Sequence, residues 1–162
     1  MLGIGEVAPE FSGVTGEGVP FRLSDLRGRP SILFFYPKAS SPGCTVEARG
    51  FSDHYREFSE AGIAVVGISV DSVAAQHRFR DSCDLPYPLV ADPTKAIATA
   101  YGVVGLFGLA KRVTFFLDAD LRVVDRVEGM LPGPHVRRAL ERLSPGRSDP
   151  GVATSTGARE TV

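Results

Sequence analysis

SILFFYPKASSPGCTVE, residues 31–47, contains the transition that decides the fold. Ser31 to Tyr36 is an apolar run typical of a buried strand, and Pro37 ends it. The turn-forming residues Ser, Pro and Gly follow, and Cys44 stands where a new helix is expected to begin. A buried strand, a tight turn and a helix in this order indicate an α/β architecture.

The place of Cys44 at a helix start favours a reactive thiol. A helix N-terminus leaves backbone N–H groups without intrahelical partners and carries partial positive charge. Both effects stabilise the thiolate, which is the nucleophilic form of cysteine. A free cysteine is often no more than a small buried apolar side chain, and that alternative is the stronger one within a strand. At a strand-to-helix junction after a Pro-Gly turn, we favour the chemical role.

The composition is that of one globular domain. The chain has 162 residues, of which 43% are hydrophobic and 23% charged, enough for one core. A net charge of −1 gives no electrostatic footprint for nucleic acid, and no apolar run approaches the length needed to cross a membrane. The N-terminus, MLGIGEVAPEF, lacks the basic and long apolar segments of a secretory signal. We therefore expect a cytoplasmic protein, in which any disulfide is transient and catalytic.

Strand and helix patterns alternate along the rest of the chain. Strands are expected as a hairpin over 11–23, singly over 31–36, 63–70 and 87–91, and as a second hairpin over 112–117 and 122–127. Helices are expected over 44–61, from 71 or 72 to 83, from 92–93 to 101–102, and over 134–143, with one turn at 24–28. This order predicts a three-layer α/β sandwich.

The composition changes after residue 143. Residues 144–162, SPGRSDPGVATSTGARETV, contain no Leu, Ile, Phe or Met and are rich in Ser, Thr, Gly and Pro. Such a segment buries too little apolar surface to offset its ordering entropy. We expect one domain over residues 1–143 and a disordered C-terminal tail over 144–162.

The spacing of Pro37, Ser41 and Cys44, with Arg112 at the start of a later strand, is a specific combination. It resembles the peroxiredoxins, which are thiol peroxidases on a thioredoxin-like fold. YPKASSPGCTVEARGF, residues 36–51, is most similar to the bacterioferritin comigratory protein branch, and LPYPLVAD and RVTFFLD further along agree. The resemblance covers roughly residues 1–143. It implies a thioredoxin-like three-layer sandwich with a mixed central sheet.

The resemblance implies roles for five residues around the turn. Cys44 matches the peroxidatic cysteine, and Pro37 matches the proline that shields it from solvent. Ser41 stands where the family has Thr or, less often, Ser, whose hydroxyl bonds the peroxide. Arg112 matches the arginine that contacts thiolate and substrate, and Glu47 matches a frequent partner in that polar network. Without the resemblance, Arg112 is an ordinary strand charge and Glu47 a first-turn residue that favours the helix dipole.

The second cysteine leaves two alternatives open. Many members of the branch carry a resolving cysteine five residues after the first, and Arg49 occupies that position here. Some relatives place it at the end of the next helix, so the resemblance implies that Cys83 forms an intramolecular disulfide with Cys44. Phe79, four residues earlier, shares its helix face, and core packing is therefore the alternative role of Cys83.

No metal or cofactor is expected. The cysteines form no Cys-x-x-Cys pair, which argues against a structural zinc site, and the glycines from Gly102 to Gly108 do not match a dinucleotide fingerprint. His54, His77 and His135 are expected on the surface.

The leading interpretation is a thiol-dependent peroxidase that reduces hydrogen peroxide and organic hydroperoxides, as a monomer or weak dimer. The resemblance implies thioredoxin or a similar dithiol protein as its reductant. One alternative is a one-cysteine peroxidase in which an external thiol resolves Cys44. Another is a redox sensor or chaperone-like binding protein that uses the same oxidation as a signal. A general disulfide oxidoreductase is disfavoured by the missing Cys-x-x-Cys.

Overall fold

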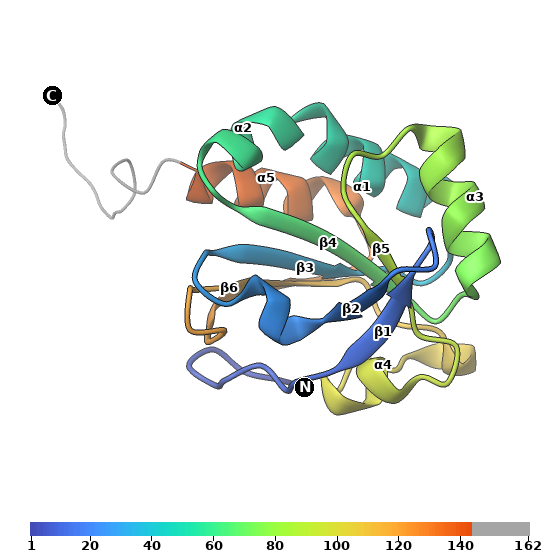
Figure 1. The fold of residues 1–162 in the computed structure, drawn as a ribbon, viewed down its shortest axis with the longest axis horizontal. Coiled ribbons are helices and arrows are strands. Elements are labelled where there is room, and N and C mark those ends of the chain that lie inside the picture. Colours follow the sequence, from blue (N-terminus) through green and yellow to red (C-terminus); the bar gives the residue numbers. More distant parts are fainter. Residues whose placement is uncertain (144–162) are drawn as a thin grey trace, which may run out of the picture.

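A mixed seven-stranded sheet forms the centre of the protein in the computed structural model, which describes residues 1–143 (Figure 1). Its strands are β1 (Ser12–Thr15), β2 (Pro20–Arg22), β3 (Ser31–Phe35), β4 (Ala64–Ser69), β5 (Leu89–Ala91), β6 (Val113–Leu117) and β7 (Val123–Glu128). Their order is β2-β1-β5-β4-β3-β6-β7. The pairs β3–β4 and β4–β5 are parallel and the other pairs are antiparallel, so the predicted mixed sheet is confirmed.

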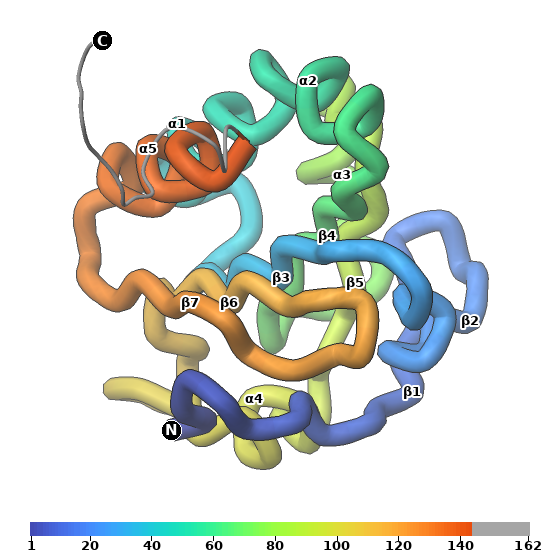
Figure 2. The backbone as a smooth tube through the Cα atoms, turned by 90° about the vertical axis from the view of Figure 1, so that its left-hand side faces the viewer, coloured from blue at the N-terminus to red at the C-terminus, as the bar shows by residue number. Residues whose placement is uncertain are grey.

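Helices cover both faces of the sheet and complete the three layers (Figure 2). One face carries α1 (Pro42–Asp53), α2 (Tyr55–Glu60), α3 (Val73–Cys83) and α5 (Pro132–Arg142). The opposite face carries α4 (Ala96–Ala100) and the N-terminal segment. Two short 3-10 turns, η1 (Leu23–Leu26) and η2 (Leu106–Gly108), lie in the connections. This arrangement confirms the predicted sandwich.

Strand β3 shows how the sequence specifies the two core layers. All five of its residues are buried. Leu33 and Phe35 pack into the cluster below the sheet with α4, whereas Ile32 and Phe34 pack into the cluster above it with α1. Successive strand side chains point to opposite faces, so a strand covered on both sides is apolar throughout.

The helix after β3 differs from the prediction in its bounds and its face. It begins at Pro42, with Ser41 as its N-cap, and it breaks at His54, where α2 follows as a separate helix. A proline at the first helical position is favourable because its missing N–H would have no partner there. The sequence predicts an apolar stripe on this helix formed by Val46, Phe51, Tyr55 and Phe58. This prediction is wrong at Val46, whose exposed fraction is 61%.

Other departures are local. The helix expected from Asp92-Pro93 begins only at Ala96, because the Asp92 carboxylate accepts from the backbone N–H groups of Ile97 and Ala98, at 3.1 and 2.8 Å, across an intervening turn. The predicted tail, 144–162, lies outside the described residues. Within residues 1–143, no helix is long and apolar enough to cross a membrane.

Candidate active site

Cys44 lies in the first turn of α1, directly beyond the carboxyl end of β3. Its side chain is 1% exposed and it is not bonded to Cys83. The position is the third of the helix, where backbone N–H groups have no intrahelical partner. Burial and the helix start thus come together at this sulfur, and of the two the sequence predicts the helix start.

Arg112 reaches Cys44 from the start of β6, the strand that pairs with β3. Its Nη2 donates to the Cys44 sulfur at 3.5 Å, and its Nη1 donates to Oε1 of Glu47 at 2.5 Å. Its Nε donates to the carbonyl of Met130 at 2.8 Å, and only 4% of the residue is exposed. Burial lowers the pKa of Arg112, but the charges of Glu47 and Cys44 raise it more, so the net shift is upward. The result is a permanently charged donor held in a fixed orientation beside the sulfur.

Glu47 is the buried acid of this site. It lies three residues after Cys44, on the same face of α1, and is 0% exposed. Burial raises the pKa of Glu47 from its ordinary value of 4.5 to about 7, although Arg112 acts in the opposite direction. Its second oxygen, Oε2, is buried without a hydrogen-bond partner among residues 1–143.

His135 is part of the same network, and its predicted surface position is wrong. The residue lies in the first turns of α5 and is 0% exposed. Its Nδ1 lies 2.8 Å from the Thr114 hydroxyl and 3.8 Å from Oε2 of Glu47. The signal that could have found it is its spacing: Ala139, four residues on, is also buried on this helix face.

The turn before α1 is fixed from the neighbouring strand. The backbone N–H of Ala39 donates to Oδ2 of Asp71 at 2.8 Å, and the Ser69 hydroxyl donates to the same oxygen at 2.7 Å. Pro37 is half-buried at the start of this turn. The hydroxyl of Ser41 donates to the carbonyl of Lys38 at 2.8 Å, so it is not directed at Cys44.

Gly43 is needed for the close approach of Arg112. A Cβ atom at this position would lie 3.1 Å from Nη2 of Arg112, which is tighter than most such contacts. A side chain here would push the guanidinium away from the neighbouring sulfur. The sequence identifies Gly43 only as a residue of the turn before the helix.

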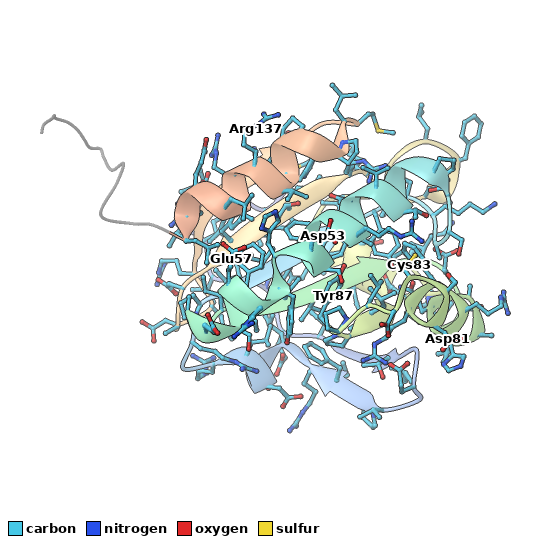
Figure 3. All side chains as sticks on the ribbon, turned by 90° about the horizontal axis from the view of Figure 1, so that it is seen from above. Asp53, Glu57, Asp81, Cys83, Tyr87 and Arg137 are labelled. Atoms are coloured by element: carbon cyan, nitrogen blue, oxygen red, sulfur yellow. The ribbon has the colours of Figure 1, made fainter. Side chains whose placement is uncertain are left out.

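Cys83 is not part of this cluster. It is the last residue of α3 and is half-buried against the core above the sheet. Near it, Tyr87 donates its hydroxyl to the carbonyl of Ala48 in α1 at 2.6 Å. Figure 3 looks down on the helical face and labels Cys83 on α3 and Tyr87. The structure therefore brings Cys44, Glu47 and Arg112 together and leaves Cys83 on a separate element.

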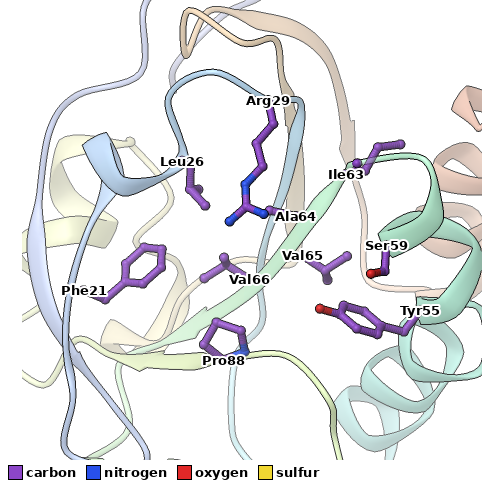
Figure 4. A pocket seen from close by; sticks show the side chains of 11 residues that line it. Phe21, Leu26, Arg29, Tyr55, Ser59, Ile63, Ala64, Val65, Val66 and Pro88 are labelled. Carbon is purple, nitrogen blue, oxygen red and sulfur yellow. The ribbon is translucent and has the colours of Figure 1, made fainter.

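Two cavities lie away from Cys44. One, of about 130 Å³, is lined by Phe21, Arg29 and Tyr55 (Figure 4). The other, of about 380 Å³, lies between Phe116 and the end of α5. No group of three or more His, Cys, Asp or Glu residues within 1–143 could hold a metal ion.

The chain is similar to known proteins over most of its length. The AhpC/TSA family profile matches residues 4–126. The chain is 41% identical over 124 residues to a protein named putative peroxiredoxin bcp from Coxiella burnetii, covering 72% of this chain and 82% of that protein. It is 33% identical to peroxiredoxin Bcp of Bacillus subtilis, covering 86% and 94%. The crystal structure of peroxidoxin BcpB from Mycobacterium tuberculosis superposes with a TM-score of 0.84 at 38% identity, covering 91% of this chain and 100% of that one.

Proposed function

The chain belongs to the AhpC/TSA family of peroxiredoxins and is a thiol peroxidase, and we propose that Cys44 is its peroxidatic cysteine and Cys83 its resolving cysteine. The observation that carries the first assignment is the Arg112 guanidinium, which donates to the Cys44 sulfur from a buried, fixed position. Glu47 holds the other end of that guanidinium.

The proposed reaction begins at the sulfur. The Cys44 thiolate attacks one peroxide oxygen, the O–O bond breaks, and its electron pair leaves with the second oxygen. That oxygen takes up a proton and departs as water or an alcohol, while Cys44 becomes a sulfenic acid. Negative charge thus moves from sulfur to the leaving oxygen, and donors aimed at both positions lower the barrier.

Thiolate formation alone does not explain a fast reaction. An ordinary thiol with a pKa of about 8.5 is only about 3% ionised at pH 7, and one with a pKa of about 6 is roughly 90% ionised. Intrinsic nucleophilicity falls with thiol pKa, and a slope of about 0.45 costs about thirteenfold in rate. The net gain is only about twofold, so transition-state stabilisation must supply the remainder.

Arg112 and the helix start supply that stabilisation in our proposal. The donors are Nη2 of Arg112, which donates to the sulfur, and the backbone N–H groups of Gly43 and Cys44 in the first turn of α1. The Ser41 hydroxyl joins them when it turns from the Lys38 carbonyl to the peroxide. Pro37 keeps bulk water from the thiolate.

We propose hydrogen peroxide and organic hydroperoxides as substrates. An exposed apolar side chain beside the site supports the organic ones: Met130, whose carbonyl accepts from Arg112, is 68% exposed. The printed title of a similar structure, from Xanthomonas campestris at 28% identity, describes alkyl peroxide reduction by that protein.

Resolution requires the second thiol. In the proposed step Cys83 attacks the sulfenic sulfur of Cys44, the S–O bond breaks, and water leaves with the thiol proton. Thioredoxin or a similar dithiol protein then reduces the disulfide by exchange. The packing of Cys83 against the core favours one alternative, a one-cysteine peroxidase in which an external thiol takes its place.

Mass spectrometry without reductant tests these assignments. One equivalent of hydrogen peroxide should convert the protein to a Cys44–Cys83 disulfide within one chain. Catalytic consumption of peroxide with thioredoxin identifies an enzyme, whereas stoichiometric consumption identifies a redox sensor. Sedimentation of the reduced and oxidised protein tests the proposed monomer or weak dimer.

A further inference from the structure

Oε2 of Glu47 is a buried polar atom without a hydrogen-bond partner among residues 1–143. Such an atom carries the full cost of its desolvation, so its surroundings are informative. Oε1 of the same carboxyl is occupied by Nη1 of Arg112. On the other side, Nδ1 of His135 lies 3.8 Å from Oε2, which is longer than a hydrogen bond and within ion-pair distance.

The partners of His135 assign the protons of its ring. Nε2 lies 2.8 Å from the carbonyl of Gly129, which can only accept, so Nε2 carries a proton. In the neutral ring Nδ1 is then an acceptor, and it receives the Thr114 hydroxyl at 2.8 Å. Burial and the charge of Arg112 both lower the pKa of His135, which favours this neutral form. A basic nitrogen therefore faces the unpartnered oxygen.

We propose that His135 is a positioning residue for peroxide reduction: its Nδ1 draws the proton taken up by buried Glu47 to Oε2, so that Oε1 keeps holding Arg112 beside Cys44. The proposal rests on the proposed function only in giving Arg112 its role at the sulfur.

The two oxygens of Glu47 differ in what a proton would meet. A proton on Oε1 points at the N–H of Arg112, so that two donors face each other and the guanidinium is displaced. A proton on Oε2 points at Nδ1 of His135, once the Thr114 hydroxyl turns away and the 3.8 Å gap closes. Because burial raises the pKa of Glu47 to about 7, its carboxyl takes up a proton near neutral pH, and one of the two oxygens then carries it.

Four titratable groups lie around Glu47 and His135, in or next to four different elements. Cys44 lies beside Glu47 on α1, and Arg112 precedes β6. Tyr36, at the end of β3, and Tyr87, before β5, lie close to Cys44 and Glu47, and burial raises the pKa of both phenols well above the ordinary range, so they stay neutral. Arg112, which contacts both Glu47 and Cys44, is thus the neighbour whose position depends on which oxygen of Glu47 carries the proton.

NMR of the histidine ring and of the carboxyl group tests, without any activity measurement, whether Glu47 and His135 share this proton in the wild-type protein. With ¹⁵N-labelled histidine and ¹³C-labelled glutamate, His135 should show a protonated Nε2 and an unprotonated Nδ1 at pH 8.5. Between pH 8 and 6 the Nδ1 signal should move together with the Glu47 carboxyl signal, at one shared midpoint. A Glu47 titration to which Nδ1 of His135 does not respond, or no Glu47 titration in this range, overturns the proposal.

The rate of Cys44 oxidation in a single turnover provides the second test, because it needs neither Cys83 nor a reductant. His135→Gln keeps a donor for the Gly129 carbonyl and removes the basic nitrogen that faces Glu47. Its rate with hydrogen peroxide should match wild type at pH 8.5 and fall on the order of tenfold below it at pH 6. His54→Gln, an exposed histidine substitution beside Glu57, is the matched control and should follow wild type throughout.

The outcomes separate the two proposals. If His135→Gln and wild type have superimposable pH profiles, the positioning role is wrong while the peroxidase assignment stands. If wild type itself does not react through Cys44 at pH 8.5, the proposed function fails, and the NMR titration still decides whether the proton is shared. Should His135→Gln not fold, as judged by its thermal transition, the wild-type NMR result alone decides.

Discussion

Nη2 of Arg112 donates to the sulfur of Cys44 at 3.5 Å, although the two residues are 68 positions apart in the chain. The register of the sheet produces this contact. Phe35 at the end of β3 pairs with Val113 at the start of β6, so Arg112 emerges beside the strand end from which the chain turns into α1. The antiparallel β3–β6 pairing thus places the Arg112 guanidinium beside the Cys44 sulfur.

Replacing Cys44 by serine should abolish peroxidase turnover, because the hydroxyl of serine is a far weaker nucleophile and cannot form a sulfenic acid. Stopped-flow measurement of peroxide consumption checks this. Cys83→Ser is the control, and it should still consume one equivalent of peroxide in a first turnover. Near-normal turnover in Cys44→Ser would refute the assignment of the peroxidatic cysteine.

Arg112→Ala should slow the oxidation of Cys44 by on the order of a hundredfold, the scale for losing one donor that stabilises developing charge. Raising the pH should not restore the rate, because the lost interaction acts on the leaving oxygen as well as on the thiolate. Arg56→Ala, at a side chain that is 90% exposed, is the control and should behave as wild type. Full recovery at high pH would mean that Arg112 only favours thiolate formation.

The sequence predicts the parts of this site that are local in the chain. The apolar run of β3, the Ser-Pro-Gly turn and the place of Cys44 in the first helical turn are all readable from neighbouring residues. The fold class follows from the alternation of strands and helices and is confirmed. Arg112 and Glu47 were found only through the family resemblance, because nothing near either residue in sequence distinguishes them from surface charges.

Burial of a polar side chain is what the sequence analysis missed. The sequence predicts His135 on the surface, yet the packing of α5 over α1 and β6 encloses it. The proximity of His135 to Oε2 of Glu47 depends likewise on a tertiary contact. Such contacts join segments far apart in the chain, where periodicity carries no information.

Glu47→Gln should change how stability depends on pH. The pKa of Glu47 is raised by burial from 4.5 to about 7, so between these values the folded protein binds the proton more tightly than the unfolded chain. The stabilisation is therefore complete below pH 4.5 and is lost as the pH rises through 7. From pH 5 to 8, the free energy of unfolding of wild type should fall relative to Glu47→Gln by on the order of 2 kcal/mol.

Denaturant unfolding of both proteins at several pH values measures this difference. His135, whose pKa is lowered by burial, contributes an opposite slope on the acid side. Because its Nδ1 lies 3.8 Å from Oε2 of Glu47, the difference between the two curves reports the titration of Glu47 together with its effect on His135. Gln cannot ionise, and its own curve should be the flatter one in this range. Parallel curves would show that Glu47 is ionised throughout and that Arg112 outweighs its burial.

Cys83 should resolve the sulfenic acid only after local unfolding. Cys44 and Cys83 lie unbonded on separate helices, and we expect their Cα atoms to be farther apart in the reduced protein than the about 7 Å that a disulfide allows. The Tyr87 hydroxyl, bound to the Ala48 carbonyl at 2.6 Å, ties the segment after Cys83 to α1. Tyr87→Phe removes this bond and should speed disulfide formation about fivefold, the effect of about 1 kcal/mol, and lower over-oxidation of Cys44. Tyr101→Phe, which loses a 2.8 Å bond to the Pro9 carbonyl on the other face of the sheet, is the control.

Quenched-flow mass spectrometry measures the rates of disulfide formation and of over-oxidation. Hydrogen exchange should rise around residues 43–50 or 79–85 in the disulfide form. An unchanged rate in Tyr87→Phe contradicts the tie, and turnover with thioredoxin in the absence of any Cys44–Cys83 bond establishes the one-cysteine mechanism instead.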